Sequence, residues 1–151
     1  MEKFLEATYD KFIFRVQTDC LYTKNDFWVY MQGNIATVGV TDFLQKVSGD
    51  VVLLETIKPG TEVKQGQGIG TIETIKATFD ILSPVTGTVA ETNPEMTDNP
   101  YLINQDPYGT GWIYRIELTE PEGDKVGLLK AEDYFGVMKE KINQEAKRLY
   151  G

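Results

Sequence analysis

The sequence contains no histidine, and this absence removes several kinds of chemistry at once. Ser–His and Cys–His nucleophilic pairs, imidazole general bases and histidine-ligated zinc all depend on that side chain. Cys20 is the only cysteine, so the chain can form neither an intrachain disulfide nor a thiolate metal cluster. We therefore expect no metal site and a reducing, cytoplasmic location. Chemistry must come from carboxylates, lysines, tyrosines or a covalently attached group.

Long hydrophobic runs and an excess of positive charge are also missing. No stretch approaches 18 apolar residues, and the start, MEKFLEATYDKF, contains no apolar segment typical of a signal peptide. The 23 acidic and 15 basic residues give a net charge of −8. Nucleic acids and anionic membranes bind basic surfaces, so neither is an expected partner. An acidic surface favours a soluble monomer and can direct it to basic sites on other proteins.

The middle of the chain is a series of short β-rich segments separated by turn residues. WVYMQGNIATVGV (28–40) predicts a hairpin around Gly33, and strands continue to GWIYRIEL (111–118), broken by a polar loop that ends at Pro107. This spacing is typical of a small all-β barrel or sandwich. The sequence therefore predicts one domain over 1–151, with a β core at about 22–118.

Helices are predicted at three places around this core. Apolar residues at three- and four-residue intervals predict helices over 1–12 and about 130–150. Thr41 and Asp42 are candidate caps of a short helix that Gly49 ends. We expect a mainly β fold with helical additions at both ends.

Two patterns with possible chemistry have simpler explanations. Gly66, Gly68 and Gly70 lie before a strand, whereas a phosphate-binding loop precedes a helix, so we interpret them as turn glycines. The carboxylates are scattered among loops with no spacing that selects a catalytic pair, and we expect most of them to be solvated. These carboxylates are Asp42, Asp50, Glu55, Glu73, Asp80 and Asp106.

Lys76 has a setting that most surface lysines lack. Two β-rich segments, 69–75 and 78–82, are joined by only Lys76 and Ala77, which places the amine at the tip of a hairpin. Rigid presentation of one amine suits a site that a modifying enzyme must reach. The local pattern makes modification a hypothesis and leaves an unmodified surface lysine open.

Four segments resemble, in order and spacing, the lipoyl carrier proteins typified by the H protein of the glycine cleavage system. The resemblance covers about residues 22–118. The segments are YTKNDFWV (22–29), ATVGVTDFLQKVSGDVV (36–52), PGTEVKQGQGIGTIETIKATFDILSPVTGTV (59–89) and NPYLINQDPYGTGWIYRIEL (99–118).

The resemblance implies a barrel–sandwich hybrid fold in which Lys76 carries lipoic acid in amide linkage. Lipoate ligase or lipoyltransferase recognition would involve Glu73, three residues before the lysine, and Gly87, eleven after it. Gly60 matches a turn glycine of lipoyl domains. The dithiolane of lipoic acid would supply the sulfur chemistry, while the protein delivers it as a carrier that is not itself an enzyme.

The chain departs from the family at positions that the resemblance places in the cavity for the loaded arm. Where the family has His-Glu before tryptophan, this sequence has Asp26 and Phe27, and a position that is often His or Tyr is Phe43. The family aspartate four residues after the lysine is retained as Asp80. Because phenylalanine cannot pair with an ammonium, the cavity is expected to suit a less cationic cargo.

Two cargoes therefore remain open for the arm. One is an aminomethyl group carried, with reducing equivalents, among glycine decarboxylase, aminomethyltransferase and dihydrolipoyl dehydrogenase. The other is a sulfur intermediate of a cytoplasmic heterodisulfide-reductase-like pathway with its own enzymes. The overall pattern favours the first and Phe27 favours the second. An unlipoylated interaction module and an enzyme that uses Lys76 as a nucleophile also stay open.

Overall fold

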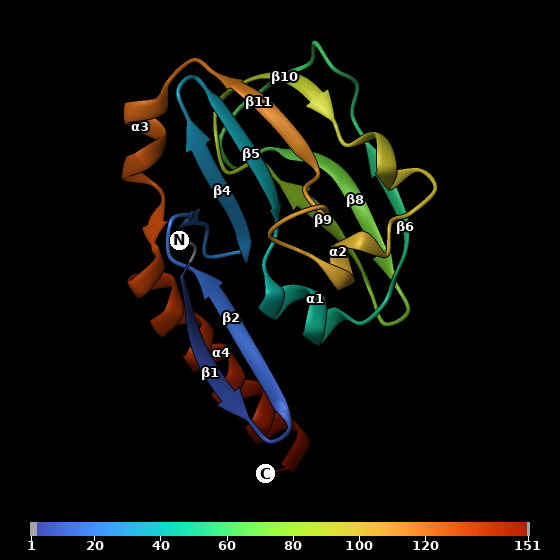
Figure 1. Ribbon diagram of the computed structural model, residues 1–151, viewed down its shortest axis with the longest axis vertical. Helices are drawn as coiled ribbons and strands as arrows, with labels where there is room; N and C mark the ends of the chain where they lie inside the picture. The colour runs from blue at the N-terminus through green and yellow to red at the C-terminus, as the bar shows by residue number, and fades with distance from the viewer. Residues whose placement is uncertain (1–2, 151) are drawn as a thin grey trace.

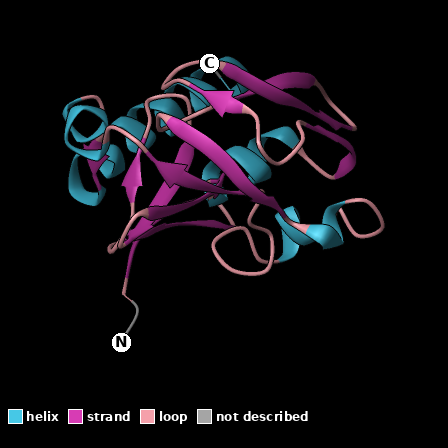
Figure 2. Ribbon diagram, turned by 90° about the horizontal axis from the view of Figure 1, so that it is seen from above, coloured by secondary structure: helices cyan, strands magenta, loops and turns pink. Residues whose placement is uncertain are grey.

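The computed structural model describes residues 3–150, with side chains described as far as Ala146, and its strands form three antiparallel sheets (Figure 1). A seven-stranded sheet has the order β12-β3-β4-β5-β11-β10-β7, a three-stranded sheet the order β6-β8-β9, and β1 pairs with β2 alone. The bounds are β1 (Phe4–Tyr9), β2 (Phe12–Gln17), β3 (Leu21–Tyr22), β4 (Phe27–Gln32), β5 (Ile35–Val40), β6 (Val51–Thr56), β7 (Glu62–Val63), β8 (Gly68–Thr74), β9 (Thr78–Leu82), β10 (Gly87–Thr92), β11 (Tyr114–Leu118) and β12 (Leu129–Lys130). Figure 2, seen from above, shows strands running in several directions with long loops between them.

The main core lies between the seven-stranded and three-stranded sheets. Phe27 and Val29 of β4 belong to the same buried cluster as Ile72 of β8 and Ile81 of β9. Residues of β4 therefore alternate between this cluster and a second one that contains Trp28. The predicted mainly β barrel–sandwich architecture is confirmed, and the hairpin expected at 28–40 is formed by β4 and β5 around Gly33, whose φ is +60°.

The helices and helical turns are α1 (Asp42–Ser48), η1 (Pro94–Met96), α2 (Leu102–Gln105), α3 (Pro121–Val126) and α4 (Ala131–Tyr150). The Thr41 hydroxyl accepts a hydrogen bond from Leu44 N at 3.3 Å, so the predicted cap of α1 is confirmed. The segment expected as one polar loop before Pro107 contains η1 and α2, and α3 was not predicted. No helix among residues 3–150 is long and apolar enough to cross a membrane.

The helix predicted over 1–12 is wrong. Residues 4–9 form β1, which pairs with β2 from Phe4↔Gln17 to Tyr9↔Phe12, while residues 1–2 lie outside the described part of the chain. Exposed and half-buried residues alternate along β1, a period of two that sparse bulky residues can mimic at helical spacing. Pairing with β2 also satisfies main-chain groups along both strands, which local spacing does not reveal.

The predicted C-terminal helix is confirmed as α4, and it covers the second buried cluster. Tyr134, Met138 and Ile142 recur at four-residue intervals and face Phe14 of β2 and Tyr22 of β3. Figure 1 shows the β1–β2 hairpin and α4 side by side, projecting together beyond the barrel. The two ends of the chain thus build one appendage next to α1.

Buried tyrosines make the fold sensitive to alkali. Burial raises the pKa of Tyr22, Tyr114 and Tyr134 above the ordinary value of 10.0, with Asp26 adding to the effect at Tyr134. The unfolded chain loses these protons at lower pH than the folded chain does. The stabilisation is therefore complete below pH 10 and declines as pH rises towards the folded-state pKa values, by about 1.4 kcal/mol per group and pH unit. We expect the phenolate absorbance of these three buried tyrosines to appear at the same pH as the loss of circular dichroism. Ionisation of these phenols near pH 10 in a chain that stays folded would contradict this account.

Candidate functional site

Lys76 lies in the turn that joins β8 to β9. Thr74 N donates to Ala77 O at 2.7 Å, and the Thr74 hydroxyl oxygen accepts from Lys76 N at 3.2 Å and from Ala77 N at 3.0 Å. Thr74 is 6% exposed, so its side chain closes the turn from inside. Sequence reasoning missed Thr74, although a hydroxyl residue just before a tight turn is a known local signal.

The side chain of Lys76 is exposed to solvent. Among the described residues its amine has no hydrogen bond or ion pair. The turn itself is held to the loop after α1, because Ile75 N donates to Asp50 O at 3.0 Å. The backbone around Lys76 is therefore fixed, while its amine has no partner among the described residues.

Glu73 and Asp80 lie on the outer face of the three-stranded sheet, close to this turn. Glu73 pairs with Thr78, and Asp80 pairs with Thr71, two residues before Glu73, so both carboxylates share one face. Both side chains are exposed, and neither forms an ion pair within the described part of the chain. An enzyme that approaches Lys76 can reach them.

The two glycines expected to aid ligase recognition have different environments. Gly60 is exposed with a φ of +91°, so it is a turn glycine with open space around it. Gly87 is buried in β10, where a Cβ atom would lie 1.9 Å from Glu117 O of the neighbouring strand. The fold therefore needs glycine at 87 whether or not a ligase reads it. Of the cluster interpreted as turn glycines, Gly66 lies in a turn, whereas Gly68 and Gly70 belong to β8.

Of the residues predicted to form the arm cavity, the structure brings only Phe43 into a pocket with Lys76. Phe27 is 3% exposed and packs into the main core. Asp26 accepts a hydrogen bond from Tyr134 Oη at 2.7 Å and forms an ion pair with Lys141 Nζ at 2.8 Å. The buried carboxylate of Asp26 therefore holds α4 against the barrel.

The pocket that contains Lys76 is a groove of about 210 Å³ between α1, the β1–β2 hairpin and α4. Its apolar lining comes from Phe12, Phe14, Phe43, Val47 and Ile142. Sequence reasoning did not connect Phe12 or Phe14 with Lys76, because that connection depends on the unexpected hairpin. Nowhere in residues 3–150 do three or more potential metal-ligand side chains gather.

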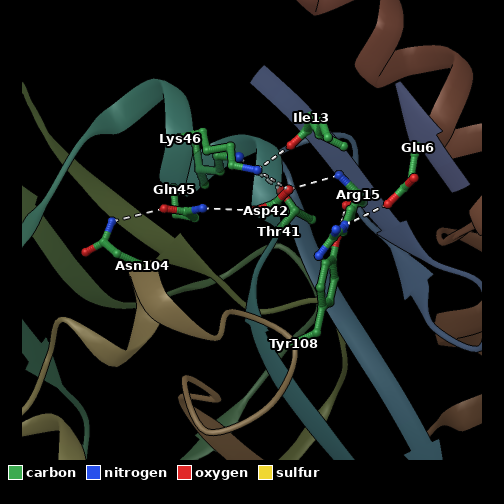
Figure 3. Close-up of polar contacts among 10 residues, drawn as sticks. Glu6, Ile13, Arg15, Thr41, Asp42, Gln45, Lys46, Asn104 and Tyr108 are labelled. Atoms are coloured by element: carbon green, nitrogen blue, oxygen red, sulfur yellow. Dashed lines mark hydrogen bonds and ion pairs between the residues drawn. The ribbon is translucent and has the colours of Figure 1, made fainter. Parts of the chain in front are cut away.

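A buried carboxylate joins α1 to this hairpin, as Figure 3 shows. Asp42 is 6% exposed, and its oxygens accept hydrogen bonds from Arg15 N at 2.9 Å, Gln45 Nε2 at 2.9 Å and Lys46 Nζ at 3.0 Å. Lys46 Nζ also donates to Ile13 O. Asp42 was expected to be solvated with most of the carboxylates, and that expectation is wrong at this position, because three donors replace its water.

Comparisons with known proteins agree with this geometry. A family model described as glycine cleavage H-protein matches residues 20–141. The chain is 43% identical over 121 residues to the probable glycine cleavage system H protein of Aeropyrum pernix, covering 80% of this chain and 84% of that one. It is 39% identical over 125 residues to the glycine cleavage system H protein of Carboxydothermus hydrogenoformans, covering 83% and 95%.

A solved structure is similar too. The crystal structure of a glycine cleavage system H protein from Mycobacterium marinum superposes with a TM-score of 0.69 at 30% identity, covering 79% of this chain and 95% of that one. The β1–β2 hairpin precedes the stretch that the family model matches.

Substitution of Gly87 tests its structural role. Because the added Cβ of Gly87→Ala would force β10 away from β11, we expect the free energy of unfolding to fall by about 3 kcal/mol in chemical denaturation. The control Gly60→Ala adds only backbone strain, and should lose about 1 kcal/mol. Equal stability of Gly87→Ala and the unchanged chain would show that β10 has room for a side chain.

Proposed function

Because this chain belongs to the glycine cleavage H-protein family, whose members carry lipoate, we propose that it is a lipoyl carrier with lipoic acid attached to Lys76 in amide linkage. The observation that carries the proposal is the exposed amine, which has no partner among the described residues and stands in a turn closed by Thr74. This setting fits the group, because acylation of the amine breaks no ion pair or hydrogen bond of the described chain.

The protein's own part in the reaction is presentation. When bound, lipoic acid supplies a dithiolane that accepts electrons and carries a group on sulfur. The closed turn sets the point from which the arm extends, and the tie between Ile75 N and Asp50 O limits its movement. A rigid attachment point raises the effective concentration of the arm's end at sites within its reach.

The overall family match supports an aminomethyl group and reducing equivalents as the cargo. The partners would be glycine decarboxylase, aminomethyltransferase, dihydrolipoyl dehydrogenase and the lipoate ligase or lipoyltransferase that loads Lys76. Glu73 and Asp80 are exposed near the turn, where a ligase could read them. In this role the chain is a carrier component rather than an enzyme.

A sulfur cargo is the second candidate, and one observation favours it. The position that the resemblance assigns to a carboxylate for the ammonium is Phe27, and the neighbouring Asp26 is already engaged by Tyr134 and Lys141. Reconstitution with glycine decarboxylase and aminomethyltransferase separates the two candidates. Glycine cleavage by the reconstituted set supports the first, whereas inactivity of a fully lipoylated chain supports the second.

Replacing Lys76 tests the attachment site. Lys76→Arg keeps the positive charge but cannot be acylated by a ligase, so we expect an intact fold, no lipoyl mass increment after co-expression with a lipoate ligase, and complete loss of carrier function. The unchanged chain, expressed in parallel, is the control. Intact-mass spectrometry gives the answer, and an unchanged mass of the control chain would remove the carrier proposal.

Replacing Phe27 tests whether this position faces the cargo. Because the ring lies in the main core, Phe27→Glu should bury an unpaired carboxylate and lower the free energy of unfolding by about 3 kcal/mol or more, while Phe27→Leu should lose about 1 kcal/mol. Thermal denaturation and aminomethyl transfer are measured on both variants. Better transfer by a Phe27→Glu chain of normal stability would show that side chain 27 reaches the arm.

A further inference from the structure

The groove beside Lys76 has an outer wall that the family model does not include. Phe12 and Phe14 belong to β2, which precedes the matched residues 20–141, and they lie on the same face of that strand. Ile142 belongs to α4 and directly follows the last residue of the family match. Phe43, Lys46 and Val47 of α1, together with Lys76, fall within the match.

The part of this outer wall that β2 forms is held in place by hydrogen bonds between its main chain and side chains of other elements. Arg15 N donates to Asp42, Arg15 O accepts from Tyr108 Oη at 2.8 Å, and Ile13 O accepts from Lys46. These bonds join Ile13 and Arg15 of β2 to α1 and to the loop before β11. The groove is therefore a standing feature of the fold, and a group that enters it does not have to order the hairpin first.

The inside of the groove suits an uncharged, sulfur-containing group. Aromatic and aliphatic side chains line it, and sulfur makes favourable contacts with aromatic ring edges. Three charged residues besides Lys76 touch the groove. Lys46 is engaged by Asp42 and Ile13 O, Asp10 is an exposed residue of the turn between β1 and β2, and Glu145 is a half-buried residue of α4. Lys76 itself lines the groove, so an acyl chain on its amine starts from a residue beside the groove.

We infer that the β1–β2 hairpin and α4 form an apolar berth for the lipoyl arm, in which Phe12 shields the two sulfur atoms of the arm, in the dithiolane ring or as the reduced dithiol, between encounters with partner enzymes. This inference rests on the proposed attachment of lipoic acid to Lys76. It assigns the outer wall of the berth, formed by Phe12, Phe14 and Ile142, to residues outside the family match, and it does not use Phe27, Asp26 or Asp80. A hydrocarbon chain and a neutral ring leave water on entering the groove, so the docked arm is favoured over the free arm.

Alkylation of the reduced arm measures this shielding. The lipoylated chain is reduced with a phosphine, and iodoacetamide is added. A sulfur of the arm then forms a bond to carbon while iodide leaves and the thiol proton passes to the buffer. Mass spectrometry of the peptide that contains Lys76 follows the reaction, so that Cys20 is not counted. A short lipoyl-lysine peptide gives the rate for an unshielded arm, and we expect the intact chain to react more slowly.

Two variants of the same strand make the comparison sharp. Phe12 is 46% exposed and lines the groove, whereas its neighbour Ile13 is 43% exposed and does not line it. Phe12→Ser should speed alkylation about fivefold by removing contacts to the docked arm. Ile13→Ser should leave the rate unchanged, and Phe12→Leu should stay close to the original rate.

The possible outcomes distinguish a failure of the berth from a failure of the proposed lipoic acid attachment to Lys76. Absence of the lipoyl increment on Lys76 overturns both. A lipoylated chain whose alkylation rate is the same with Phe12 and with Ser at position 12 overturns the berth and leaves the carrier proposal standing. Equal acceleration by Ile13→Ser also overturns the berth, because it would trace the effect to a loosened hairpin.

Discussion

The buried carboxylate of Asp42 is the contact on which the surroundings of Lys76 depend. Removing an ionised carboxylate from water is unfavourable by several kcal/mol unless donors replace the water, and here three donors do so. One of them is the main-chain amide of Arg15 in β2. The hairpin therefore cannot leave α1 without exposing the Asp42 carboxylate or leaving it without one of its donors.

Asp26 plays a corresponding part at the other side of the appendage. Its carboxylate takes a hydrogen bond from Tyr134 and an ion pair from Lys141, and the stacked rings of Tyr22 and Tyr134, 4.5 Å apart, add an apolar contact. Phe27, the other residue at the position of the family's His-Glu pair, is buried in the main core. Each residue serves the fold, one by anchoring α4 and the other by filling the core.

Local patterns in the sequence predicted the elements whose causes are local. The β4–β5 hairpin, the Thr41 cap, the position of Lys76 in a turn and the amphipathic α4 all follow from residues close together in the chain. β1 lies within the helix predicted over 1–12, because the residues of β1 alone do not reveal the pairing with β2 that stabilises this strand. The roles of Asp26 and Asp42 depend on partners 115 and 27 residues away, which no local pattern reveals.

The groove beside Lys76 is made from opposite ends of the chain, and this affects when it can exist during synthesis. Phe12 and Phe14 are synthesised before the β8–β9 turn, and Ile142 is synthesised after it. A nascent chain thus contains Lys76 before the groove can be complete. The attachment residue Lys76 is therefore in place before the wall of the groove that α4 contributes.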